Sequence, residues 1–324
     1  MKNKNITEKV YISLCKACDK ILSHQQTTIE TNAIQILHVI RPHTFFINRY
    51  DGIINNFSIL SIFLIRLKNI AIIKIIFILS LLKINRFYKK NNFLNKKIDI
   101  LFISHYLNKF QIGHKEDFYF GNLPYDIKKY GYKSLIALIN HTGVEADFLS
   151  NNWNYKQKIP RVILSKTINF LKEFNYALRL LKESFRLFNM ARKTKKIFDR
   201  NLLMRSSEEC FSNKAMVNFR IAHQISELIY KYKPRYIIMT YEGHSFERLI
   251  FAKARMINRK IICISYQHSV IFKLQHAIYG HVKKKYNPDI ILTSGSMGKK
   301  ELKKSKKLKN IPINILGSQR PIQK

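Results

Sequence analysis

Six short apolar runs rich in β-branched residues alternate with helix-forming segments, and this alternation limits the possible fold more than any other feature of the sequence. Each run ends in small or polar residues, as buried parallel strands do where they deliver a loop to the edge of a sheet. The runs cover residues 96–105, 133–141, 235–241, 260–268, 288–294 and 313–318. The sequence therefore predicts an α/β fold with a Rossmann-like, doubly wound parallel sheet, in which ligands bind beyond the carboxyl ends of the strands.

Two helical regions interrupt this alternation. Residues 1–95 show helical periodicity, and we expect a helical N-terminal region that packs on the core or is apposed to a membrane. Residues 96–294 then form the Rossmann-like domain, with a basic helical insertion at about residues 160–232. Residues 295–324 are predicted to begin a second domain, of which this sequence contains only the start.

The segment 57–82 is where contact with a membrane has to be considered. Arg66, Lys68 and Lys74 divide it into runs that are shorter than the roughly 20 apolar residues of a spanning helix. We therefore favour a core helix, or a helix lying in the bilayer interface with its lysines directed outward, over a membrane span.

The chain of 324 residues is strongly basic. Its 58 Lys and Arg residues against 20 Asp and Glu residues give a formal charge of +38, which predicts attraction to nucleic acid, acidic lipid or phosphorylated substrates. A drift in nucleotide composition toward Lys, Asn and Ile explains the same charge without any function. Four scattered cysteines indicate a reducing compartment, and the polar N-terminus lacks a secretory signal, so we expect a cytoplasmic protein.

The stretch TYEGHSFERLIFAKAR, residues 240–255, places two glutamates at the end of a predicted strand. Glu247 falls in the first turn of the following helix, where a carboxylate interacts well with the exposed amides, so a purely structural role is as good an interpretation as a catalytic one. Glu242 faces the predicted crevice. Among apolar walls its pKa would be raised, and it is our first candidate for a general base toward a hydroxyl nucleophile.

Other polar residues follow the predicted strands at the same edge. His268 ends the neighbouring strand and is predicted to help stabilise a leaving group, although a lone histidine at a strand end is more often structural. The candidate substrate-binding residues are Ser104, His105, Asp117, Gly121, His244, Arg248, Gln267 and Ser269.

Several familiar motifs are incomplete. SGSMGKKE, near residue 298, lacks the first glycine and the Ser or Thr of a Walker loop, which leaves only a weak possibility of anion binding at a helix start. The sequence has no D-x-D or H-E-x-x-H motif, and no histidine pair at a recognised metal spacing has a matching third ligand. We therefore predict neither a metal nor a cofactor.

Taken in order, the motifs ILHVIRPHTFFINRYDGI, ILFISHYLN, DFYFGNLP, ALINHT, TYEGHSFERLI, SYQHS and ILGSQR resemble a family of bacterial surface-carbohydrate biosynthesis proteins. This family is glycosyltransferase-like with a GT-B architecture, and is distantly related to the Kdo and sialic acid transferases of capsule and lipopolysaccharide assembly. The resemblance runs from about residue 30 to the C-terminus.

The resemblance implies two Rossmann-like domains facing each other across a cleft, with the acceptor mostly on the first and the nucleotide sugar mostly on the second. It also implies an inverting transfer in which Glu242, or Glu247 as second candidate, deprotonates the acceptor hydroxyl while His268 supports the leaving group. The partners would be a nucleotide sugar and a glycan or lipid-linked acceptor at the inner face of the cytoplasmic membrane. This sequence ends about where the resemblance places the start of the second domain. Three alternatives follow: the chain is truncated, the missing half is a separate polypeptide, or the protein no longer catalyses.

Two other classes of function stay open. A nucleic-acid-binding protein would explain the charge, but we find no RNA-binding, zinc-finger or helix-turn-helix signature, so no specific nucleic acid is expected. A non-catalytic scaffold at an anionic membrane surface would depend on residues 57–90 and tolerate replacement of Glu242.

Overall fold

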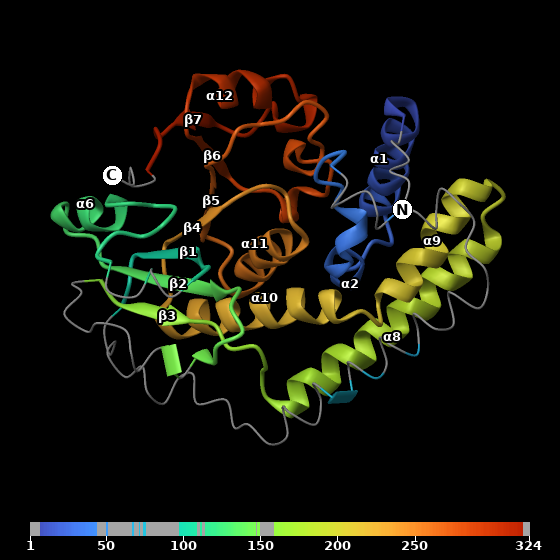
Figure 1. The fold of residues 1–324 in the computed structure, drawn as a ribbon, viewed down its shortest axis with the longest axis horizontal. Coiled ribbons are helices and arrows are strands. Elements are labelled where there is room, and N and C mark those ends of the chain that lie inside the picture. Colours follow the sequence, from blue (N-terminus) through green and yellow to red (C-terminus); the bar gives the residue numbers. More distant parts are fainter. Residues whose placement is uncertain are drawn as a thin grey trace.

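The computed structural model describes residues 7–43, 97–108, 114–146 and 159–319, with a few isolated positions between these ranges. Its centre is a seven-stranded sheet in the order β3-β2-β1-β4-β5-β6-β7 (Figure 1). Every neighbouring pair of strands is parallel. The predicted α/β class and Rossmann-like sheet are therefore confirmed.

The strands are short and almost continuously buried, as strands covered on both faces should be. They span Ile100–Tyr106 (β1), Ser134–Asn140 (β2), Arg161–Ile163 (β3), Tyr236–Thr240 (β4), Ile262–Gln267 (β5), Ile290–Thr293 (β6) and Ile313–Ile315 (β7). From the central β1 the chain adds β2 and β3 on one side and then returns to place β4 on the other side. The order of the strands thus reverses between β1 and β4, which is the position where ligands bind in open α/β sheets.

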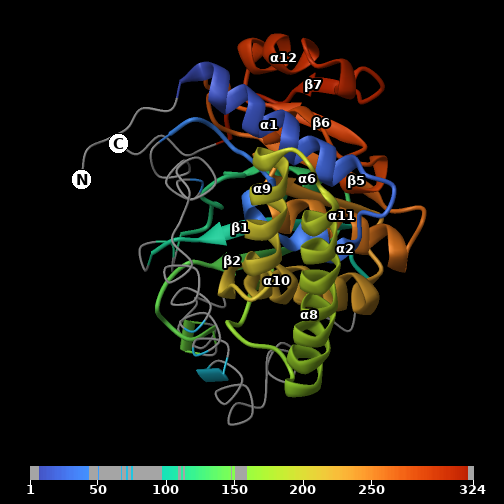
Figure 2. The same ribbon diagram turned by 90° about the vertical axis from the view of Figure 1, so that its right-hand side faces the viewer.

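Helices cover both faces of the sheet and extend beyond one end (Figures 1 and 2). They span Glu8–Ser23 (α1), Ile29–Ala33 (α2), Leu123–Lys129 (α6), Phe170–Lys193 (α8), Ile197–Glu209 (α9), Asn213–Tyr232 (α10), Ser245–Ile257 (α11) and Ser296–Lys303 (α12). The larger core joins one face of the sheet to α10, α11 and the N-terminal helices. The smaller core lies on the other face around Phe102, Phe120 and Tyr125, beside α6.

The region predicted as a helical insertion contains a strand as well as helices. The predicted range of about 160–232 begins with β3, which pairs with β2, and continues with α8, α9 and α10. The assignment of its first residues to a helix is therefore wrong, because they pair in parallel with β2. A buried ion pair between Glu173 on α8 and Arg220 on α10, 2.6 Å apart, joins two helices of this region.

The N-terminal helices pack against the last third of the chain. The Tyr11 hydroxyl donates to the carbonyl of Leu274 at 2.8 Å, and the backbone amide of Ala277 donates to the carbonyl of Val39, also at 2.8 Å. Cys15 and Cys18 are free and buried on the inner side of α1. The beginning of the chain is thus part of the same core as the sheet.

The end of the described chain also belongs to this sheet. The domain boundary predicted at residue 295 falls between β6 and β7, and α12 and β7 complete the sheet. The predicted membrane-contacting segment, residues 57–82, lies almost entirely outside the described residues. Within the described ranges, none of the helices combines the length and the apolar character needed to cross a bilayer.

Candidate functional site at the carboxyl edge of the sheet

The reversal point of the sheet is marked by a row of polar side chains. His105, near the end of β1, contacts Thr240 at the end of β4 through Nε2 and Oγ1, which are 2.9 Å apart. Its Nδ1 lies 2.7 Å from Nε2 of His141, the residue that follows β2. Burial, assisted by His141 and His244, lowers the pKa of His105 to about 3. His105 is therefore a neutral imidazole that links three neighbouring strands.

Aromatic packing extends this row across the edge. The ring of Tyr119 lies 5.3 Å from that of His105 and 4.6 Å from that of His268, edge to face in both cases. The predicted residues His105 and His268 are thus brought to the same edge. Tyr119 and His141, which were not among the predicted site residues, complete the row.

Glu242 lies where the sequence predicts it, but its electrostatic environment differs from the prediction. Its carboxylate accepts a hydrogen bond from the Ser269 hydroxyl at 3.1 Å and lies 3.4 Å from Nε2 of His244. These interactions, led by the hydrogen bond from His244, outweigh burial and lower the pKa of Glu242 to about 2. The expected raised pKa is therefore wrong, because polar partners and not apolar walls surround this carboxylate. It is ionised at any physiological pH.

Glu247 is the buried carboxyl of this loop. Its oxygens accept hydrogen bonds from the backbone amides of Gly243 at 2.7 Å, His244 at 2.8 Å and Glu242 at 3.2 Å. Burial raises its pKa to about 7, although these amides favour the ionised form. All its contacts are with the loop that carries Glu242, so Glu247 shapes that loop and is turned away from ligands.

Arg248 also faces inward. It is 1% exposed, and its guanidinium donates to the side-chain oxygen of Asn287 at 2.5 Å, to the carbonyl of Tyr286 at 3.3 Å and to the carbonyl of Ala277. The predicted substrate-binding role does not fit this position, since these contacts hold the segment 277–287 against α11. The sequence places Arg248 near the start of a helix but does not show that its side chain points into the core.

Three further predicted residues, one on β1 and two in the turn at residues 117–121, contact one another or close that turn. Asp117 is buried, accepts from the Ser104 hydroxyl at 2.8 Å, and accepts from the backbone amides of Tyr119 and Phe120 at 2.9 Å each. Gly121 closes the turn with φ of +50°, and a Cβ there would lie 1.9 Å from the carbonyl oxygen of Gln319. Ser104, Asp117 and Gly121 therefore position Tyr119 and do not themselves line the edge.

Gln267 does not join Glu242 in the predicted cleft. It is 1% exposed, and its Oε1 lies 2.5 Å from where a Cβ on Gly298 would be, beneath the first turn of α12. Neither polar atom of its amide has a hydrogen-bond partner among the described residues. Ser269, two residues later, does reach Glu242.

Two cavities open at this edge. The smaller, of about 200 Å³, is lined by Glu242 and Ser269 and by residues from two other segments, Ile40, Arg41, Phe272 and Gln275. The Arg41 guanidinium lies 4.2 Å from the centre of the Phe272 ring. The larger, of about 510 Å³, lies between the end of β2 and the start of α10 and includes His141, Lys166 and Asn213. Its volume is in the range of small-molecule sites.

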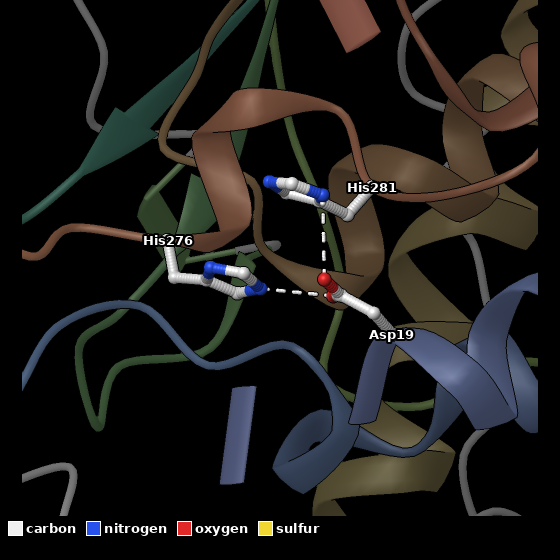
Figure 3. A group of neighbouring side chains, drawn as sticks. All are labelled: Asp19, His276 and His281. Atoms are coloured by element: carbon white, nitrogen blue, oxygen red, sulfur yellow. Dashed lines mark hydrogen bonds and ion pairs between the residues drawn. The ribbon is translucent and has the colours of Figure 1, made fainter. Parts of the chain in front are cut away.

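A second polar cluster lies outside the sheet edge. Asp19 on α1 contacts His276 and His281, and together they form the group of potential metal ligands found among the described residues (Figure 3). The sequence analysis missed it because Asp19 is 257 residues away from His276. The sequence does show His276 and His281 close together, but no residue near them completes a metal-binding motif.

Comparison with known proteins identified no relative. No family model, curated protein or solved structure matches the chain.

Proposed function

We propose that this protein binds a glycan acceptor at the carboxyl edge of its sheet and serves sugar transfer from a nucleotide sugar in surface-polysaccharide biosynthesis. The observation that supports this proposal is the position of Glu242. It is an ionised carboxylate, held by His244 and Ser269, in the wall of a cavity at the edge where α/β sheets bind ligands. Sugar hydroxyls donate strong hydrogen bonds to such a carboxylate.

The other walls of this cavity suit a sugar ring. Phe272 is 49% exposed and offers an apolar surface for the C–H groups of a sugar. Gln275 and Arg41 add polar groups on the same wall. A small cavity with one exposed ring and few polar groups fixes the orientation of a ligand, as specificity for one monosaccharide unit requires.

The structure changes the role that we give Glu242. A carboxylate with a pKa of about 2 is a weak base. We therefore assign Glu242 to binding and orienting the acceptor hydroxyl, and not to removing the proton of that hydroxyl. Glu247 keeps the loop in shape through three amide hydrogen bonds. The formal charge of +38 supports the proposed location at an anionic inner leaflet.

The binding experiment uses saturation-transfer NMR with a panel of free sugars and CMP-, UDP- and GDP-sugars. The panel includes Kdo, N-acetylneuraminic acid, hexoses and N-acetylhexosamines, each measured at physiological salt. We expect at least one saccharide to bind the wild-type chain. Glu242→Gln should weaken that binding by about tenfold or more, because a charged hydrogen bond contributes about 1.5–3 kcal/mol, and should leave the circular dichroism spectrum unchanged.

The matched control is Glu227→Gln on α10. Glu227 also lies beside a histidine, His223, at 3.1 Å, and its side chain is 40% exposed against 30% for Glu242. Equal saccharide binding by the Glu242 and Glu227 variants would contradict the proposal, as would the failure of every saccharide to bind. Binding of a DNA duplex alone, lost steeply with salt, would favour the nucleic-acid alternative.

A further inference from the structure

The cluster at Asp19 brings three metal-ligating groups from two distant segments to one point. Nε2 of His276 lies 2.8 Å from one oxygen of Asp19, and Nδ1 of His281 lies 3.3 Å from the other. The two imidazole rings stack with centroids 4.5 Å apart and planes inclined by 11°. All three ligand atoms lie within 4.8 Å of one another, and Figure 3 shows both rings beside the Asp19 carboxylate.

We propose that Asp19, His276 and His281 form a binding site for a divalent transition-metal ion of the Zn²⁺ class. Bonds of about 2.0–2.2 Å to nitrogen and oxygen place tetrahedral ligand atoms roughly 3.3 Å apart. The separations of 2.8 and 3.3 Å are close to that value. Small rotations of the two rings are enough to admit an ion between the three groups.

The ligand set selects the class of ion. Two imidazoles and one carboxylate suit Zn²⁺, Co²⁺ and Ni²⁺, whereas Mg²⁺ and Ca²⁺ prefer oxygen ligands. The side chains are 17% (His276), 23% (Asp19) and 29% (His281) exposed, so an ion can enter from solvent and keep a water ligand.

The position of this site indicates a structural role. It joins α1 to the segment 276–281, whose neighbour Gln275 lines the cavity at Glu242. The same segment is held on its other side by Arg248, which donates to the carbonyl of Ala277. A bound ion would therefore fix the N-terminal helix and the wall of the candidate site to each other.

The experiment uses the full chain, freed of any purification tag and of metal by EDTA followed by dialysis. Co²⁺ is titrated in and followed by its visible d–d absorption, Zn²⁺ affinity is measured by competition with a chromogenic chelator, and thermal unfolding is recorded with Zn²⁺ and with Mg²⁺. We expect a single equivalent to bind, and Zn²⁺ but not Mg²⁺ to raise the unfolding temperature.

Variants locate the ion. Asp19→Asn and His281→Asn should each weaken Zn²⁺ binding by more than about 100-fold, since loss of even a supporting contact costs 10–100-fold. His223→Asn, which alters a histidine beside another carboxylate, should bind as the wild type does. If Asp19→Asn does not fold, His281→Asn decides, because His281 is the most exposed of the three. Wild-type binding no tighter than that of His281→Asn would overturn the proposal and leave an ordinary ion pair.

Discussion

Replacing Glu247 by Gln tests whether burial or hydrogen bonding from backbone amides determines the pKa of this buried carboxyl at the start of α11. Burial raises its pKa to about 7, while three backbone amides donate to it. Gln has nearly the shape of the protonated acid. Its side-chain oxygen can keep the two short bonds from Gly243 and His244, so we expect the variant to fold.

The sign of the pH dependence follows from the raised pKa. A carboxyl whose pKa rises from 4.5 in the unfolded chain to about 7 in the folded protein holds its proton more tightly when folded. Its contribution to stability is complete below the unfolded value and is lost as pH rises through the folded value, a change of about 3 kcal/mol. A Gln side chain has no proton to lose, so the variant escapes this loss.

The measurement is urea unfolding of both proteins, followed by circular dichroism at several pH values from about 5 to about 8. In the variant an NH₂ group replaces one of the two carboxyl oxygens that the Glu242 amide contacts at 3.2 Å, which should cost about 1 kcal/mol at every pH. By pH 5 the wild type has already lost a similar amount, because the carboxyl of the unfolded chain is mostly ionised there. We therefore expect the two proteins to be about equally stable near pH 5. Near pH 8 the variant should be more stable by about 2 kcal/mol.

Glu242→Gln is the control for this experiment. The pKa of Glu242 is lowered to about 2, so its carboxylate is ionised in the folded and unfolded chains throughout this pH range. Its difference from wild type should change much less with pH. A Glu247→Gln variant that loses stability relative to wild type as pH rises would refute the reasoning, because amide donors and the helix dipole would then outweigh burial.

Two further substitutions test how the site loop is held. Gly243→Ala should cost more than about 3 kcal/mol in urea unfolding, because φ is +89° and the new Cβ would lie 2.4 Å from the carbonyl carbon of Ala277. The control, Gly131→Ala, has φ of +85° in open space and should cost only about 1 kcal/mol. Equal losses would show that the close approach to Ala277 does not matter. Arg248→Lys should lower the free energy of unfolding by about 2–4 kcal/mol, because a lysine cannot donate to three separate acceptors. Arg255→Lys on the same helix alters an ion pair with Asp289 and should cost less than about 1 kcal/mol. Similar losses in the two variants would contradict a special role for Arg248.

The sheet was predictable from sequence because its strands are continuous apolar runs separated by helices. Each of the six predicted runs contains a strand of the sheet. The missed strand, β3, has three residues and completes the sheet beside β2.

The candidate site was less predictable because side-chain directions depend on contacts that are distant in sequence. The sequence places Glu242 at the sheet edge, but it does not show that the carboxylate accepts a hydrogen bond from Ser269, 27 residues away. Glu247 and Arg248 lie in the first turn of α11 and are both turned inward, at 2% and 1% exposure. Asp19 has no local signal that connects it with His276.

The packing of α1 and α2 on the last third of the chain has a consequence during protein synthesis. The Tyr286 hydroxyl reaches the carbonyl of Thr28, 258 residues earlier, and Tyr11 reaches Leu274 across 263 residues. At translation rates of about 5–20 residues per second, the first helices wait roughly 13–50 s for these partners. The apolar side of α1 is exposed for that time, so we expect α1 to be a binding site for chaperones on the ribosome, and α1 and α2 to be the last elements to dock.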